Sequence, residues 1–329
     1  MAEVARIPIA DASPDLAAVG AAARFWLQVE GGLSGVFELP ALVVRGAEPG
    51  PVLVAVAGVH GDEYEGMEAI RRVFAALDPA LLHGTFLGIP VANPFAYEAR
   101  ARVAPTHVDG LNLARIFPGD AVGTPSQRLA HDLLALVTRS VGPEDLFVDF
   151  HSGSADVAFA PLVGFRNVAA RSAVASEAAA RHFGLPRIWR IPDSAGPFNA
   201  ETARRGIPTV GTETTGRAGC NAADVETFVD GLRNLLAFKG MLPCVPPAIP
   251  RSEEARTTVD LLAPTTGFLR VERRLFDEVE EGELLGTLLT PFGDAIAAIH
   301  APTAGTLWAL RSMPAVRAGE LVGMIAVRG

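Results

Sequence analysis

Short apolar runs alternate with amphipathic stretches along the first three quarters of the chain. Compact apolar runs bounded by Gly, Pro or polar residues are typical of buried strands, and apolar residues that recur every three to four positions are typical of helices. The predicted strands are 24–29, 36–44, 52–57, 85–91, 146–150, 157–163, 187–191 and 207–213. The predicted helices are 67–77, 125–141, 169–183, 196–206 and 222–240. This alternation predicts an α/β fold with a mixed, largely parallel sheet flanked by helices, with a hairpin around Gly31-Gly32 leading into it.

The last quarter of the chain has a different pattern. Residues 241–256 are rich in proline and are expected to be a linker. Residues 257–329 show no clear helical pattern, and Ala263-Pro264-Thr265-Thr266-Gly267 is echoed by Ala301-Pro302-Thr303-Ala304-Gly305. We therefore predict two domains, 1–245 and 257–329, and expect the second to be a small β module built from two similar halves.

Composition and charge exclude several classes of protein. The chain has 329 residues, of which 49% are hydrophobic, which is enough for one large core and a smaller one. Its net charge is -9 and it contains no basic tract, so we expect no nucleic-acid partner. We see no targeting segment and no apolar run of about 18 residues, and therefore expect a cytoplasmic protein without a membrane span.

Two strand-end turns carry residue types that bind metals. His60 and Glu63 follow the predicted strand 52–57, and His151 directly follows the strand 146–150. Ligands of open α/β sheets bind beyond the carboxyl ends of the strands. Catalytic zinc uses three protein nitrogen or oxygen ligands and leaves a fourth position for water. We predict one Zn²⁺ per chain on these side chains; the alternative is a pair of turns with solvated polar groups.

Glu213 ends another predicted strand and is the candidate general base. A carboxylate beside a catalytic zinc takes a proton from water and later passes it to the leaving amine. The alternative is a glutamate that caps a helix or forms a salt bridge. Asp149 either orients His151 or caps the end of its strand.

The long polar segment 95–119 supplies candidates for contacts with a substrate. Arg102 and Arg115 are each suited to stabilising an oxyanion or to holding a carboxylate, and Asn112 to adding a hydrogen bond. Single arginines in loops are more often simply solvated. Their concentration beside Asn-Pro and Phe-Pro-Gly turns favours a functional loop, because loops of this length in compact domains are usually functional or disordered.

Several separated motifs together resemble the succinylglutamate desuccinylase/aspartoacylase family, which is related to zinc carboxypeptidases. They occur in the family's order and span most of the chain. They are Gly58-Val59-His60-Gly61-Asp62-Glu63, Asn93-Pro94, Asp109-Gly110-Leu111-Asn112-Leu113-Ala114-Arg115-Ile116-Phe117-Pro118-Gly119, Asp149-Phe150-His151-Ser152-Gly153 and Thr212-Glu213-Thr214-Thr215-Gly216.

The resemblance implies roles for these residues. It implies zinc on His60, Glu63 and His151, and Glu213 as general base and then acid. It also implies Arg102 near the oxyanion and Arg115 in substrate binding. One departure is Ala114, where the family usually has an Asn that helps to grip the substrate. The C-terminal module resembles a biotinyl/lipoyl-like barrel without its carrier lysine, since Lys239 is the last lysine of the chain.

The sequence therefore predicts a zinc-dependent hydrolase that cleaves the amide bond of an N-acylated amino acid or a related small N-acyl compound. The expected partner is this small-molecule substrate, and a homo-oligomer is left open. One alternative is a metallocarboxypeptidase that acts on peptides. Another is a catalytically silent homologue that binds a small molecule.

Overall fold

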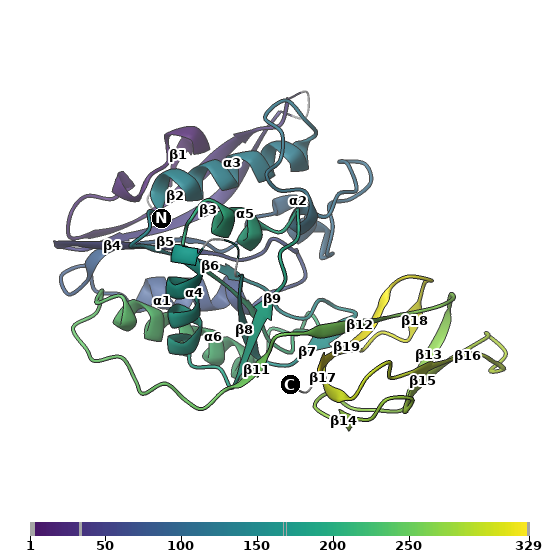
Figure 1. Cartoon of the computed structure of the whole chain (residues 1–329). Coiled ribbons are helices and arrows are strands. Elements are labelled where there is room, and N and C mark those ends of the chain that lie inside the picture. Colours follow the sequence, from purple (N-terminus) through teal and green to yellow (C-terminus); the bar gives the residue numbers. More distant parts are fainter. Residues whose placement is uncertain (1–3, 33–34, 167, 169, 328–329) are drawn as a thin grey trace.

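One large mixed sheet forms the frame of the molecule in the computed structural model, which describes residues 4–32, 35–166, 168 and 170–327 (Figure 1). Its strands are β1 (Ala5–Pro8), β2 (Ala21–Glu30), β3 (Val36–Arg45), β4 (Glu48–Val56), β5 (His83–Ile89), β6 (Leu146–Phe150), β8 (Leu162–Arg166), β9 (Arg187–Ile191), β10 (Thr209–Glu213) and β11 (Glu253–Ala255). They lie in the order β1-β2-β3-β5-β4-β6-β10-β8-β9-β11. β2 and β3 form the expected hairpin, while β5, β4, β6 and β10 are parallel neighbours. The predicted α/β class with a largely parallel central sheet is confirmed.

Helices cover both faces of this sheet. The α-helices are α1 (Glu65–Ala76), α2 (Pro94–Ala99), α3 (Pro125–Ser140), α4 (Ala170–Phe183), α5 (Phe198–Arg204) and α6 (Ala222–Phe238), and short 3₁₀ turns are η1 (Ile9–Asp11), η2 (Pro14–Leu16) and η4 (Leu113–Arg115). Residue 169, the expected first residue of one helix, lies outside the described residues. α3 begins where Thr124 and Gln127 form a capping box and Pro125 occupies the first turn.

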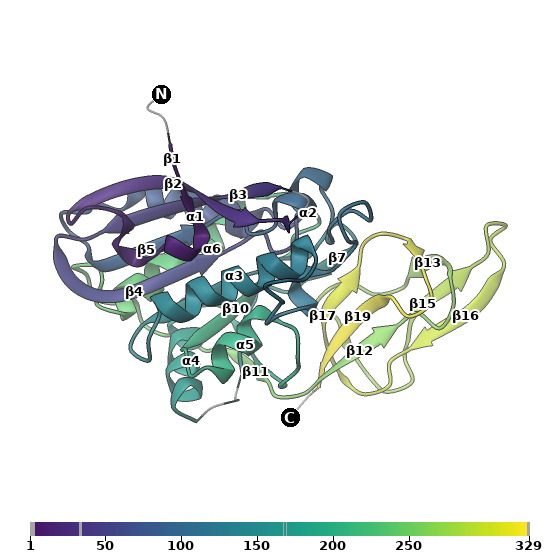
Figure 2. The same cartoon turned by 90° about the horizontal axis from the view of Figure 1, so that it is seen from above.

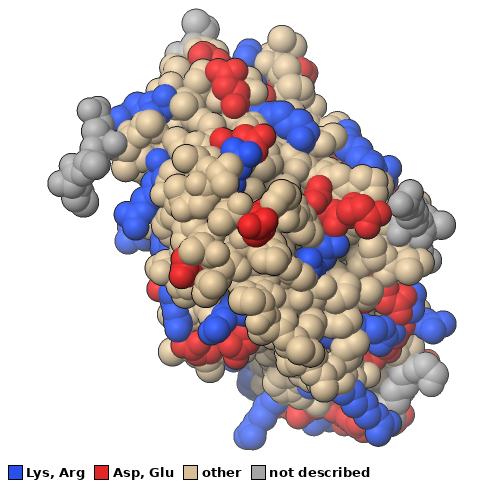
Figure 3. Space-filling view, turned by 90° about the vertical axis from the view of Figure 1, so that its left-hand side faces the viewer, with Lys and Arg blue, Asp and Glu red and all other residues tan. Residues whose placement is uncertain are grey.

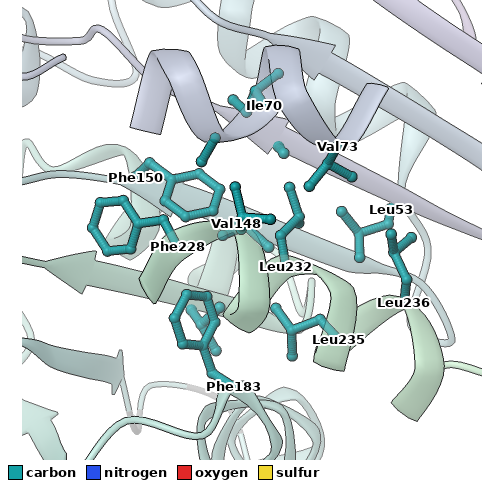
Figure 4. Packing of buried hydrophobic residues seen from close by; sticks show 14 of the residues in the cluster. Leu53, Ile70, Val73, Val148, Phe150, Phe183, Phe228, Leu232, Leu235 and Leu236 are labelled. Atoms are coloured by element: carbon teal, nitrogen blue, oxygen red, sulfur yellow. The ribbon is translucent and has the colours of Figure 1, made fainter. Parts of the chain in front are cut away.

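Alternate residues of the central strands build two separate cores. Leu53 and Ala55 of β4 pack in the cluster with α1, α4 and α6, whereas Val54 and Val56 pack in the cluster with α3 and α5. This follows from the period of two along a strand. Figure 4 shows the first cluster, in which side chains from α1, β6 and α6 meet in one layer.

The carboxyl ends of three neighbouring parallel strands position the candidate residues. β4, β6 and β10 lie side by side, so their carboxyl ends share one edge of the sheet. His60 lies in the turn after β4, His151 follows β6 directly, and Glu213 is the last residue of β10. The topology therefore brings together side chains that lie far apart in the sequence.

Asp109 fixes the polar segment 95–119 onto the start of α3. Its carboxylate accepts hydrogen bonds from the Ser126 amide at 2.9 Å, the Ser126 hydroxyl at 2.9 Å, the Thr124 hydroxyl at 2.8 Å and the Leu111 amide at 3.1 Å. Burial alone would raise the pKa of Asp109, but these hydrogen bonds outweigh it and lower that pKa. Asp109 thus attaches the segment that carries Arg102 and Arg115 to the start of α3.

The C-terminal part consists of two open antiparallel sheets. Their strands are β7 (Val157–Phe159), β12 (Thr258–Leu262), β13 (Gly267–Val271), β14 (Glu278–Val279), β15 (Leu284–Leu289), β16 (Ala295–His300), β17 (Gly305–Arg311), β18 (Ala315–Val316) and β19 (Leu321–Val327). One sheet has the order β12-β19-β17-β14 with β7 beside β17, and the other has the order β16-β15-β13-β18. The two sheets share a buried apolar cluster, and Figure 2 shows them at one end of the molecule. The small barrel expected here is not confirmed, because the strands form two separate sheets.

Two strands cross the expected boundary between the parts. The prediction of a single strand at 157–163 is wrong, because β7 and β8 are separate strands. Ala160 and Pro161 interrupt it, the Ala160 amide donates to the Trp308 carbonyl, and proline has no amide hydrogen for a ladder. β7 therefore pairs with β17 of the C-terminal part, and β8 joins the main sheet. The expected linker also contains β11, which pairs with β9. The division into domains 1–245 and 257–329 stays a prediction.

Charged side chains are distributed without a large basic area on the face shown in Figure 3, where Lys, Arg, Asp and Glu are interspersed. Within the described ranges, no helix is long and apolar enough to cross a membrane.

Trp308 is the centre of the junction between the two parts, so its truncation should destabilise the chain. Its side chain is 0% exposed and packs with Val157, Leu162 and Met324. We expect Trp308→Ala to lower the free energy of unfolding by about 3–5 kcal/mol, measured by urea denaturation. The matched control is Phe292→Ala, because Phe292 is 93% exposed. An equal, small effect of both substitutions would contradict the role given to Trp308.

Candidate metal centre

Three side chains converge at the shared edge of β4, β6 and β10. His60 Nδ1 lies 2.7 Å from Glu63 Oε1, and His151 Nδ1 lies 2.8 Å from Glu63 Oε2. Each residue offers one ligand atom, and these atoms all lie within 4.8 Å of one another. The structure therefore brings the predicted ligand set together.

The Glu63 carboxylate is surrounded by donors. In addition to the two imidazoles, it accepts hydrogen bonds from Arg102 at 2.9 Å, from the Ser154 hydroxyl at 2.9 Å and from the Ser152 amide at 3.3 Å. Burial alone would raise the pKa of Glu63, but the neighbouring imidazoles outweigh it and hold that pKa well below its usual value. The carboxylate is thus ionised and oriented before any ligand arrives.

The outer nitrogen of each imidazole also has a partner. His60 Nε2 lies 3.1 Å from Asn112 Oδ1, and His151 Nε2 lies 3.4 Å from Asp149 Oδ1. With a metal on Nδ1 in place of a proton, these acceptors would hold the single ring proton on Nε2. Asn112 therefore contacts a candidate ligand, and its predicted role in substrate binding stays a prediction.

Burial lowers the pKa of both imidazoles, but the charges beside them shift the two pKa values in opposite directions. Burial, and then the positive charge of Arg102, lower the pKa of His60 to about 4, so this imidazole is neutral at pH 7. Burial also opposes protonation of His151, but the carboxylates of Asp149 and Glu63 outweigh it and raise that pKa well above its usual value. Metal binding requires a neutral imidazole, so a cation at this centre would displace a proton from His151.

Glu213 completes the centre from the end of β10. Its Oε2 atom is buried and has no hydrogen-bond partner in the part of the chain that the structure describes. Burial, and then the negative charge of Glu63, raise the pKa of Glu213 to about 8. A divalent cation beside it would stabilise the ionised form and lower this pKa. An unpartnered carboxyl with a raised pKa is suited to accepting and releasing a proton near neutral pH.

His60, His151 and Glu213 line a cavity of about 500 Å³. Arg102, Arg115 and Arg166 give its wall positive charge, and Ala114 lies beside Arg115. Arg166 connects this wall to the centre, because it donates to Asn199 at 2.6 Å and Asn199 donates to Asp149 at 2.9 Å. The cavity has the size of a small-molecule site.

Two glycines allow the turns of the site to pack closely. A Cβ atom at Gly61 would lie 2.0 Å from the Ala96 carbonyl carbon, and one at Gly216 would lie 1.7 Å from the Gly153 carbonyl oxygen. Only glycine permits these approaches of backbone to backbone. Close packing of backbone against backbone therefore explains why glycine occupies positions 61 and 216.

The donor set fits a divalent first-row metal. Two imidazole nitrogens and one carboxylate are the ligands of many catalytic zinc sites. The unpartnered Glu213 oxygen points to a group that this chain alone does not supply. Histidine and carboxylate ligands also accept other first-row ions, so the donors identify the class of metal.

Comparison with known proteins places the chain in a family. Residues 49–239 match the succinylglutamate desuccinylase/aspartoacylase catalytic domain. The chain belongs to the succinylglutamate desuccinylase/aspartoacylase family. It is 28% identical over 305 residues to the N-alpha-acetyl-L-2,4-diaminobutyric acid deacetylase of Halomonas elongata, which covers 89% of this chain and 86% of the relative.

Solved structures show the same fold over almost the whole chain. The product-bound ectoine utilization protein EutE (DoeB) of Ruegeria pomeroyi has a TM-score of 0.85 and 24% identity, over 93% of this chain and 95% of that one. A succinylglutamate desuccinylase/aspartoacylase of Rhodobacter sphaeroides has a TM-score of 0.81 and 27% identity, over 92% and 95%. The family predicted from the motifs is thereby confirmed.

The structure gives contacts to residues for which the sequence predicted no role. Ser152 and Ser154 join the two turns that carry the candidate ligands, since Ser152 donates to Glu65 at 2.6 Å and Ser154 donates to Glu63. Their position just after His151 was the available signal. Asn199 and Asp260 reach the site from distant segments, and no local pattern in the sequence marks them.

The raised pKa of Glu213 predicts a pH-dependent penalty on the metal-free fold. Between pH 4.5 and about 8 the unfolded chain loses this proton while the folded chain keeps it, so the stability contributed by this site falls as pH rises. We expect Glu213→Gln to raise the free energy of unfolding of chelator-treated protein at pH 9 by about 1–3 kcal/mol, with no gain at pH 4. Denaturation curves at both pH values measure this. A gain that does not depend on pH would refute the raised pKa.

Proposed function

We propose that this member of the family is a zinc-dependent amidohydrolase that removes the acyl group from an N-acylated amino acid. The observation that carries the proposal is that His60, His151 and Glu213 line one cavity of small-molecule size, with Glu63 held against both imidazoles. The Halomonas relative, a deacetylase of an N-acetylated diamino acid, supports the same reaction class.

The metal would be held by His60, Glu63 and His151. When bound, zinc supplies a Lewis acid that polarises the acyl carbonyl and makes water more acidic. Glu63 and His60 are already in states suited to ligation, the first ionised and the second neutral.

Glu213 moves the proton in the proposed reaction. It accepts a proton from the water whose oxygen attacks the amide carbon, and it delivers that proton to the amide nitrogen as the C–N bond breaks. The products are a carboxylic acid and an amine, which become a carboxylate and an ammonium group when the acid gives its proton to the amine. Its position at the end of β10, on the wall shared with His60 and His151, supports this role.

The arginines of the polar segment divide two tasks. Arg102 lies against Glu63 and lines the same cavity, so we assign it to the oxyanion that forms on the acyl carbonyl. Arg115 also lines the cavity, and its guanidinium is assigned to the α-carboxylate of the amino acid. Ala114 has no side-chain amide, whereas the family usually has an Asn at this position that binds the substrate. The substrate contact at this position therefore differs from the family pattern.

Metal content tests the ligand set directly. Protein purified without added metal is expected to contain about one zinc per chain by mass spectrometry, and His60→Ala/His151→Ala is expected to contain almost none. His107→Ala is the matched control, since His107 is an exposed histidine of the polar segment. Equal zinc in all three proteins, or none even after zinc is added, would remove the proposed centre.

Turnover tests the assignment of Glu213. Glu213→Gln keeps the shape of the side chain but cannot accept a proton, so hydrolysis of N-acyl amino acids should fall by at least about a hundredfold while zinc remains bound. Glu98→Gln, at an exposed position, is the control and should keep full activity. The substrate panel compares N-acetyl amino acids with peptides. Retained turnover in Glu213→Gln would exclude Glu213 as the general base, and preference for peptides would favour a carboxypeptidase.

A further inference from the structure

Strand β12 of the C-terminal part forms one wall of the candidate active site. Thr258 and Asp260 both line the cavity that contains His60, His151 and Glu213. Residues two positions apart on a strand point to the same side. Leu261 points the other way, into the buried cluster of the C-terminal sheets. The burial of Leu261 therefore fixes the register that presents Asp260 to the cavity.

The position of this wall is held from both sides. β11 ends at Ala255 and pairs with β9, whose residues Trp189 and Ile191 line the same cavity. β12 begins at Thr258 and pairs with β19 of the C-terminal sheet. Only two residues separate the two strands, so Asp260 is fixed relative to the main sheet.

Asp260 is an acidic group in a strongly basic part of the cavity. Arg102, Arg115 and Arg166 line the cavity, and Asp260 faces them from β12. Among the described residues, none of the ion pairs within 4.0 Å includes Asp260, although its charge acts on Arg115. Asp260 as a whole residue is exposed, while partial burial of its carboxyl raises its pKa, which Arg115 partly opposes. The carboxylate thus lies near the substrate site without being neutralised by a close partner.

We propose that Asp260 is a specificity-determining residue that binds a positively charged group on the side chain of the substrate. This inference rests on the proposed deacylase function. With Arg115 on the α-carboxylate and Asp260 on the wall formed by β12, the cavity is complementary to an N-acyl amino acid whose side chain carries an amine. An acidic side chain would be repelled by Asp260, so the same residue selects against N-acyl aspartate and N-acyl glutamate.

A pair of substrates that differ by one amine tests this role. The first is N-α-acetyl-L-2,4-diaminobutyrate, and the second is N-acetyl-L-2-aminobutyrate, which lacks only the amine. We expect Asp260→Asn to lower kcat/KM for the first by about tenfold or more, as for removal of one partner of a partly desolvated charge pair. For the second, kcat/KM should stay within about twofold of the unsubstituted chain.

Two further variants complete the design. Asp294→Asn is the matched control, because Asp294 is an exposed acid of the same C-terminal part and does not line the cavity; it should change neither substrate. Asp260→Lys reverses the charge and is expected to raise kcat/KM for N-acetyl-L-aspartate by about tenfold. Equal losses on both members of the substrate pair, or no loss, in a folded Asp260→Asn protein would overturn the inference and leave Asp260 a structural role.

Failure of the function and failure of the inference give different results. If the zinc-loaded unsubstituted chain hydrolyses neither substrate, the proposed function fails. Calorimetric binding of L-2,4-diaminobutyrate and of L-2-aminobutyrate then tests Asp260 without turnover. If Asp260→Asn weakens the binding of L-2,4-diaminobutyrate by about tenfold and leaves that of L-2-aminobutyrate unchanged, the subsite is supported. Equal affinity for L-2,4-diaminobutyrate in the unsubstituted and the Asp260→Asn proteins refutes the subsite. Asp260→Ser serves in the same assays should the Asn variant fail to fold.

Discussion

The site depends on one buried carboxylate, Glu63, and on the donors that compensate its burial. A carboxylate this far from solvent is stable only when it is paired and hydrogen-bonded. Two imidazoles, Arg102 and two serines of the turn after β6 meet this requirement. The same contacts bring the ends of β4 and β6 together and point the Nδ1 atoms of both histidines at one place. The contacts that stabilise the charge of Glu63 are therefore the same contacts that assemble the candidate metal site.

Parallel strand order makes this arrangement possible. Because β4, β6 and β10 are direct neighbours, the turns that follow them lie a strand spacing apart. Glycine at Gly61 and Gly216 lets these turns approach other backbone more closely than a side chain would allow. The Oε2 atom of Glu213, at the end of the third strand, is buried without a hydrogen-bond partner among the described residues, which costs stability.

The C-terminal sheets are part of the site and are not an independent appendage. β7 leaves the larger part to pair with β17, Trp308 fills the junction, and β12 forms a wall of the cavity. Asp260 reaches the cavity through this construction.

The sequence by itself determined the elements and the chemistry of the turns. Apolar periodicity located the strands and helices of the α/β part because that pattern is local, and the motifs around His60, His151 and Glu213 were sufficient to predict the family. What only the tertiary structure decided was non-local. Because the chain is interrupted at Pro161, β7 pairs with β17 and not with the main sheet. The C-terminal strands form two open sheets where a small barrel was expected, and Asp260 lines the cavity. Pairing between distant strands depends on contacts made across the fold, and a pattern within one short segment carries no information about its partner.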